Sequence, residues 1–149
     1  MSVPKGKRNE SKDKYDALYY TIFDDAIRIQ HSCFYANKNE IESNIDFIAN
    51  AQNKLNGYIW DLIVHIKTAK YIYPTTKEEY VERRIEQEKA IGICHSILTL
   101  YELTMRQLKA KDDAGVIEIQ NIRHQINALK AWRSADNKQF RHFAEQVKF

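Results

Sequence analysis

The residues best suited to chemistry in this chain are cations and aromatic rings that alternate near its C-terminal end. Trp132, Phe140 and Phe143 lie among Lys and Arg residues there. Cationic side chains neutralise phosphates and aromatic rings stack on bases, so the mixture is typical of nucleic-acid binding. The candidate phosphate contacts are Arg123, Lys130, Arg133, Lys138, Arg141 and Lys148. The alternative is that the rings close the core while the cations face water. Both hold if the rings dock the segment and so present its basic face rigidly.

Other chemistry-bearing residues do not assemble into a catalytic or metal site by spacing. Asp61 and His65 are four residues apart and could share a helix face, but two ligands do not make a metal site. Cys94 precedes His95, yet adjacent helical residues point about 100° apart, so we interpret Cys94 as a core residue. The chain contains no Glu-x-x-His pair and no glycine-rich phosphate loop. We therefore expect no enzyme, no cofactor and no bound metal.

The charge is unevenly distributed along the chain. Residues 1–14 carry five Lys or Arg against two acids, and residues 121–149 carry six against two. Residues 15–120 hold the remaining 12 basic and 16 acidic groups, a net charge of −4. Basic ends favour a polyanionic partner, RNA and possibly DNA, contacted through those ends. The alternative is that the charged ends only keep the chain soluble.

Length and composition limit the class of protein. A chain of 149 residues fits one domain with a self-sufficient core. No stretch approaches 18 consecutive apolar residues, so we expect no membrane-spanning helix. The first 30 residues lack the apolar core of a signal peptide, and the two cysteines lie inside helical patterns. These features predict a cytoplasmic protein.

The elements that must position the cations are helices. Apolar residues recur at steps of four and three through residues 39–72, a spacing that keeps them on one face of a helix. That helix would be about 50 Å long and could bury its face only against long helical neighbours. The face consists of Ile41, Ile45, Ile48, Gln52, Leu55, Ile59, Leu62, Ile66, Ala69 and Tyr73.

Three further helices are predicted around it. The first begins near Lys14 and runs to Cys33. Another begins after Pro74, where Thr75 and Thr76 each precede a glutamate by three residues in a capping box, and it ends near residue 108. The last covers residues 114–133, with Asp112 or Asp113 as N-cap. Residues 134–137 interrupt it in this interpretation, and residues 139–147 form a short amphipathic continuation.

The sequence thus predicts an all-α protein, an antiparallel four-helix bundle. Residues 1–13 contain almost nothing apolar and are expected to form a flexible basic arm. Residues 14–149 would form the single bundle domain, with the short amphipathic tail at its C-terminal end.

Two segments carry a resemblance to a known family. In residues 73–85 an aromatic residue and Pro74 are followed by polar residues, Tyr80 and then Arg84-Ile85; residues 129–134 read LKAWRS. Through them, residues 58–137 resemble the accessory variability determinant of diversity-generating retroelements, a family of small four-helix bundles. The resemblance implies a five-membered ring with a basic surface that binds nucleic acid and attaches to the reverse transcriptase of the retroelement.

The expected function combines the cations with this resemblance. We expect a non-enzymatic, oligomeric nucleic-acid-binding accessory protein that helps a reverse transcriptase to use its RNA template in mutagenic retrohoming. Arg83 and Arg84 are second candidates for contacting RNA or the enzyme. The residues expected to contact phosphates are Arg123, Lys130, Arg133, Lys138 and Arg141. The alternative is a structural helical adaptor that binds only protein.

Overall fold

The computed structural model describes the backbone of residues 10–147 and the side chains of residues 18–147, and this range is helical without strands. The predicted all-α class is confirmed. The helices are α1 (Glu10–His31), α2 (Lys38–Ser43), α3 (Ile45–Tyr71), α4 (Lys77–Gln107), α5 (Val116–Gln139) and α6 (Arg141–Ala144). Of the expected arm, residues 1–9 lie outside the described residues, and α1 begins at Glu10, four residues before the predicted start.

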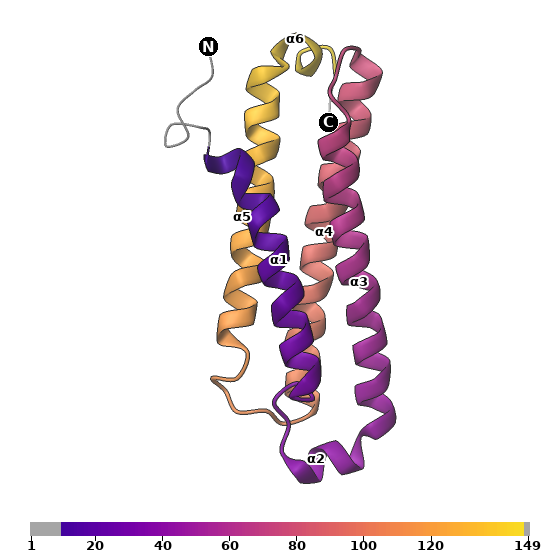
Figure 1. The fold of residues 1–149 in the computed structure, drawn as a ribbon, viewed down its shortest axis with the longest axis vertical. Helices are drawn as coiled ribbons and strands as arrows, with labels where there is room; N and C mark the ends of the chain where they lie inside the picture. Colours follow the sequence, from indigo (N-terminus) through magenta and orange to yellow (C-terminus); the bar gives the residue numbers. More distant parts are fainter. Residues whose placement is uncertain (1–9, 148–149) are drawn as a thin grey trace.

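The four long helices lie side by side along the long axis of the molecule (Figure 1). α3 packs against α4, α1 packs against α5, and α4 also contacts α5. The short helix α2 lies at one end of the molecule, and α6 lies at the other (Figure 1). Within the described range no helix has both the length and the apolar character needed to cross a membrane.

The core is formed where the apolar faces of these helices meet. On α3 the predicted face is buried from Ile48 to Ala69 except at Gln52, which is half-buried. At the ends of the face, Ile45 is 64% exposed, and Tyr73, just beyond the helix, is also 64% exposed. Each fully buried Leu or Ile contributes roughly 1.5–3 kcal/mol relative to an exposed one, so the burial of these faces stabilises the packing of the long helices. Among the described side chains, the buried apolar residues of α1 and α3 are Tyr19, Ile22, Ala26, Ile29, Ile48, Ala51, Leu55, Ile59, Leu62, Ile66 and Ala69.

The helix predicted over residues 39–72 is divided at Asn44. The Asn44 side chain donates from Nδ2 to the Glu40 carbonyl at 2.7 Å. Asparagine competes for backbone groups in this way and favours helix ends over helix interiors. Asn37 caps the short helix α2, because its side chain accepts from the Glu40 N–H.

The start of α4 follows the predicted capping box. Thr76 is the N-cap, and its Oγ1 accepts from the Glu79 N–H at 3.2 Å. The Glu79 carboxylate accepts in return from the Thr75 N–H at 3.2 Å. The hydrogen bonds from Thr75, and then those from Thr76, hold the pKa of Glu79 below its usual range.

The start and end of α5 differ from the prediction. Its N-cap is Gly115 rather than Asp112 or Asp113, with φ +73°, a left-handed conformation that L-residues rarely adopt. A Cβ on Gly115 would meet the Met105 side chain at 2.6 Å. The predicted interruption at residues 134–137 is absent, since α5 continues to Gln139 and the break falls at Phe140.

Candidate nucleic-acid interface

Both acidic residues of α5 are turned into the protein. Glu118 is 4% exposed and Asp136 is 2% exposed, and the structure describes all of α5. Each carboxylate is bound by an arginine from another helix, Arg28 of α1 for Glu118 and Arg83 of α4 for Asp136. The outward face of α5 therefore carries cationic and neutral side chains only.

At the C-terminal end of α5, Arg83 and Asp136 form a pair that we call the sealed clamp. Arg83 Nε donates to Asp136 Oδ2 at 2.7 Å, and Nη2 donates to Oδ1 at 2.9 Å. Arg83 Nη1 donates to the Ile72 carbonyl at 2.9 Å, and Gln87 Nε2 donates to Asp136 Oδ2 at 2.6 Å. With Arg83 only 8% exposed, its guanidinium holds α4, α5 and the α3–α4 turn together. Arg83, which was expected to contact RNA or the enzyme, is thus enclosed by contacts within the protein.

The aromatic rings near the C-terminal end close this clamp. The guanidinium carbon of Arg83 lies 5.1 Å from the Trp132 ring centroid and 5.6 Å from that of Phe140. Trp132 is 1% exposed and Phe140 is 7% exposed, so the core interpretation is confirmed for these two rings. Phe143 is half-buried near Tyr80, with 6.5 Å between ring centroids. Trp132 and Phe140 are thus covered and cannot stack on bases, whereas Phe143 of α6 is only half-buried.

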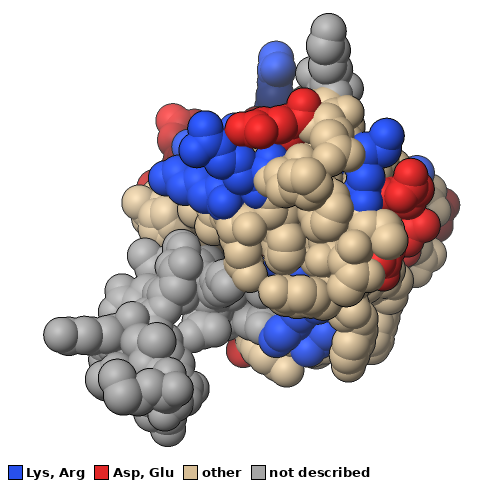
Figure 2. Space-filling model, turned by 90° about the horizontal axis from the view of Figure 1, so that it is seen from above, with Lys and Arg blue, Asp and Glu red and all other residues tan. Residues whose placement is uncertain are grey.

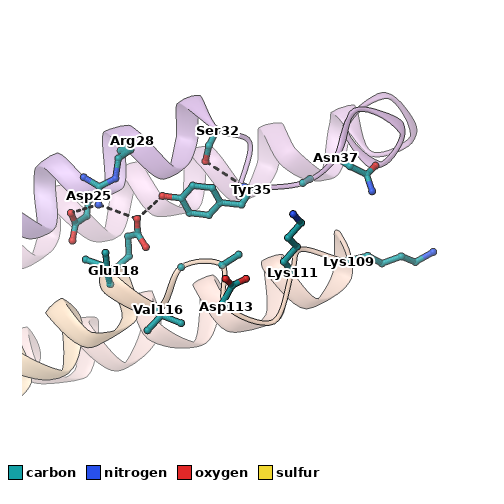
Figure 3. Close-up of a pocket in the computed structure, with 14 residues that line it drawn as sticks. Asp25, Arg28, Ser32, Tyr35, Asn37, Lys109, Lys111, Asp113, Val116 and Glu118 are labelled. Carbon is teal, nitrogen blue, oxygen red and sulfur yellow. Dashed lines mark hydrogen bonds and ion pairs between the residues drawn. The ribbon is translucent and has the colours of Figure 1, made fainter.

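At the N-terminal end of α5, Arg28 and Glu118 form a second pair, which we call the open clamp (Figure 3). Arg28 Nη2 donates to Glu118 Oε1 at 2.9 Å and to Asp25 Oδ1 at 2.8 Å. The Tyr35 hydroxyl donates to the same Glu118 oxygen at 2.5 Å, and Asn121 donates to Asp25. The Arg28 side chain is 51% exposed and lines a cavity of about 1010 Å³, which the loop before α5 borders on its other side.

The electrostatics of the open clamp keep its groups in defined protonation states. Burial raises the pKa of the Tyr35 hydroxyl, and its hydrogen bond to Glu118 raises it further, so Tyr35 stays a donor. Burial alone would raise the pKa of Glu118. Hydrogen bonds from Tyr35, from the backbone and from Arg28 outweigh that effect, and the net pKa lies below the usual range. The interactions with Tyr35, Glu118 and Asp25 hold the pKa of Arg28 above its usual range.

A strained turn after α1 places the Tyr35 hydroxyl beside Glu118 in the open clamp. Cys33, Phe34 and Tyr35 have φ values of 50°, 58° and 61°, three successive left-handed residues without a glycine. Each such residue costs roughly 1–2 kcal/mol. The Phe34 N–H donates to the Ile29 carbonyl at 2.8 Å and its ring is fully buried, which compensates part of that strain.

Three of the predicted phosphate contacts lie together on the outward face of α5. Arg123, Lys130 and Lys138 are all exposed, and at 100° per residue they fall within a sector of about 80°. They span about 22 Å along the helix axis. The Arg123 side chain is 61% exposed, with Nη2 at 3.5 Å from the Glu102 carboxylate, a loose contact that water screens.

Of the remaining predicted contacts, Lys148 lies outside the described residues, and the others are placed differently. Arg133 Nη1 donates to Glu88 Oε1 at 2.6 Å, and Arg84 Nε donates to the same oxygen at 3.1 Å. Their side chains are 25% and 14% exposed, so both arginines lie in the seam between α4 and α5 at the edge of the cationic face. Arg141 belongs to α6 and is 80% exposed, with an ion pair to Glu145.

Sequence reasoning missed two exposed aromatic residues at the same end of the molecule. Tyr71 is 84% exposed and Tyr73 is 64% exposed, although Tyr73 was expected at the end of the apolar face. Pro74 signalled only where α3 ends, because proline disfavours helix at the residue before it, and it gave no indication that the two rings are exposed. Figure 2 views this end of the bundle, where uncharged side chains occupy the centre and charged groups of both signs lie around them.

The residues considered for catalysis or metal binding have other contacts. His65 Nδ1 pairs with Glu86 across α3 and α4, and no three His, Cys, Asp or Glu groups among the described side chains are placed to hold a metal ion. Cys94 is fully buried, which confirms its interpretation as a core residue. Burial raises the pKa of its thiol to about 12, so it remains protonated at neutral pH.

Comparison of the chain with protein-family models, with curated proteins and with solved structures found no match. The case for a function therefore depends on this geometry and on the resemblance noted in the sequence.

Proposed function

We propose that this protein is a non-enzymatic nucleic-acid-binding accessory protein that helps a reverse transcriptase to use its RNA template. The observation that carries the proposal is the outward face of α5, from which both acidic residues are withdrawn into clamps. The reverse transcriptase and the diversity-generating retroelement enter through the resemblance of residues 73–85 and 129–134 to the accessory family.

The physical argument is electrostatic. A row of exposed cations on a helix whose own acids are buried lowers the free energy of a nearby phosphate backbone, and binding releases the counterions condensed on the nucleic acid. The Glu102 carboxylate of α4, 3.5 Å from Arg123, lies at the edge of this row. Arg123, Lys130 and Lys138 supply this row, and Arg133 extends it when it exchanges Glu88 for a phosphate. These contacts are made to the phosphate backbone of the nucleic acid, so the proposed binding does not depend on nucleotide sequence.

Assembly completes the proposal. The long helices act as an antiparallel four-helix bundle, and five copies form a ring, as the resemblance implies. A single α5 face offers only a few phosphate contacts and would bind weakly at physiological salt. When several copies in one ring present this face to the same RNA, the first contact raises the effective concentration of the RNA at the other faces. The ring therefore binds more tightly than a single copy.

The decisive experiment measures RNA affinity as a function of salt for a triple variant, R123Q/K130Q/K138Q. Each lost phosphate contact should reduce the slope of log affinity against log salt by roughly 0.7–0.9. The matched control is K38Q/K54Q/K111Q, which removes three exposed cations from other surfaces. A slope that is unchanged in the α5 variant, or reduced equally in both variants, would refute the assignment to α5.

A second candidate function is a helical adaptor that binds only protein. It is favoured by an apolar patch along α1 and α3, where Trp60 is 61% exposed, Val64 is 55% exposed and Ile27 is 42% exposed. Phe23 of α1 meets Trp60 edge to face, with 6.3 Å between ring centroids. Salt-insensitive binding of a protein partner that W60S/V64S abolishes, without any RNA binding, would establish the adaptor instead.

A further inference from the structure

We propose that Tyr71 and Tyr73 form a base-stacking platform, so that the nucleic acid bound by this protein is single-stranded where it crosses the end of the bundle. This inference rests on the proposed function and specifies its substrate class. It begins with exposure: Tyr71 is the most exposed large hydrophobic residue of the described side chains, at 84%, and Tyr73 follows two residues later at 64%.

The backbone holds the two rings near each other. Tyr71 is the last residue of α3, and the single residue Ile72 separates it from Tyr73. Two successive Cα–Cα steps of about 3.8 Å keep the Cα atoms of the two tyrosines within about 7.6 Å. Ile72 is itself half-buried and its carbonyl accepts from Arg83 in the sealed clamp, so the residue between the tyrosines is fixed. Two exposed rings this close together in the chain can contact neighbouring bases.

Tyr73 is supported in a way that leaves its ring accessible. It meets Phe140 at an interplanar angle of 79°, with 5.5 Å between centroids, and Phe140 is itself buried. An edge-to-face contact of this kind anchors a ring without stacking another ring on it. Pro74, which follows, is buried and restricts the backbone. The platform is therefore built on the core and loses little entropy when a base stacks on it.

Cations lie beside the ring that Tyr73 contacts. Phe140 is preceded two residues earlier by Lys138 and followed by Arg141, and both cations are exposed. Lys138 is also the last cation of the α5 row, so this row leads toward the Tyr73–Phe140 contact. Acids are present at this end as well: Glu145 pairs with Arg141, Glu78 is exposed at the start of α4, and Glu79 binds Thr75. The combination of a cationic track with exposed aromatic rings is the arrangement by which proteins bind single strands.

A duplex would not use this platform, because its bases are already stacked and their faces are covered. A single strand offers open base faces, and each base stacked on a protein ring is worth about 1–3 kcal/mol, a factor of about 5 to 150 in affinity. The platform thus predicts a preference for single strands that the α5 cations alone would not produce.

The experiment measures binding of the full chain to fluorescent 20-nucleotide unstructured RNA, to DNA of the same sequence and to the corresponding RNA duplex. We expect Y71A/Y73A to lose at least about fivefold in affinity for both single strands, with the duplex affinity and the salt slope unchanged. Y71F/Y73F should bind like the unmodified protein, because the ring and not the hydroxyl stacks. Y20A, which removes another exposed tyrosine from α1, is the matched control and should bind normally.

The outcomes separate the platform from the proposed function. Unchanged single-strand affinity of Y71A/Y73A, an equal loss for the duplex, or a loss in Y71F/Y73F as large as in the alanine variant would overturn the platform while the α5 proposal stands. Absence of salt-dependent binding of any nucleic acid by the unmodified protein would overturn both. If loss of the Tyr73 contact with Phe140 unfolds the double variant, Y71A alone decides the question, with the same expected direction.

Discussion

The two clamps perform the same task at opposite ends of α5 and differ in their access to water. In the sealed clamp, Arg83 is 8% exposed and binds both oxygens of Asp136 between two aromatic rings. In the open clamp, the Arg28 side chain is 51% exposed, and one of its nitrogens serves two carboxylates beside a cavity. Both geometries turn an acidic side chain away from the outward face of α5, so the arginine need not be buried for that effect.

The difference instead determines how much the free energy of unfolding falls when each arginine is replaced. A buried carboxylate deprived of its partner remains desolvated, whereas a carboxylate beside an open cavity can be reached by water. The sealed clamp should therefore be essential for the fold, and the open clamp should be adjustable. Each prediction below tests that contrast.

The largest effect is expected from R83M. The variant leaves Asp136 buried without a countercharge and should lower the free energy of unfolding by about 3–5 kcal/mol, measured by urea denaturation at pH 7. The double variant R83M/D136N removes both charges and should recover much of the loss. A loss for R83M below about 1 kcal/mol would show that water reaches the Asp136 carboxylate in solution.

A smaller effect is expected from R28M. Since half of the Arg28 side chain already contacts water, we expect a loss of about 2 kcal/mol, less than for R83M, in the same denaturation experiment. If R28M costs as much as R83M, the contrast between the clamps fails.

Y35F probes the third member of the open clamp. It removes one hydrogen bond to Glu118 and leaves Arg28 in place, so the expected cost is about 1 kcal/mol. Y71F, which removes a hydroxyl from a tyrosine that is 84% exposed, is the control and should leave stability unchanged. Equal stability of Y35F and the unmodified protein would mean that the strained turn does not hold Tyr35 on Glu118.

The smallest effect is a dependence on pH that E118Q should remove. The pKa of Glu118 lies below its usual range in the folded state, so its stabilising contribution is complete above the unfolded value of about 4.3 and is lost as the pH falls through the folded value. The stability difference between the unmodified protein and E118Q should thus shrink between pH 6 and pH 3. A difference that grows on acidification would contradict the sign of this pKa shift.

The helices were predictable from the spacing of apolar residues. The same spacing also indicates which face of α5 its two acidic residues share, an inference that was not made. Glu118, Ile122, Leu129, Trp132 and Asp136 fall on one face of α5. The face implies that both acids point inward, although their residue type suggested the surface. The choice of partner could not be predicted, because Arg83 lies 53 residues from Asp136 and becomes its neighbour only when α4 packs against α5.

The candidate interface shows the same limit. The sequence identified the cations of α5 and added Arg83 as a second candidate, because only packing distinguishes a buried arginine from an exposed one. The break at Asn44 was missed because the apolar spacing continues across it, whereas the hydrogen bond to Glu40 that ends α2 is local. The exposure of Tyr71 and Tyr73 depends on where the neighbouring helices end, and the apolar pattern of α3 does not predict this.

Gly115 has a consequence for how freely this chain can vary over generations. The outward face of α5 touches no core residue, so its cations can be gained, lost or moved without disturbing the fold. Gly115 is more constrained: another residue there would hold a left-handed backbone at a cost of roughly 1–2 kcal/mol, and its Cβ, at 2.6 Å, would displace the end of the Met105 side chain. The start of this 24-residue helix is thus less free to change than its outward surface.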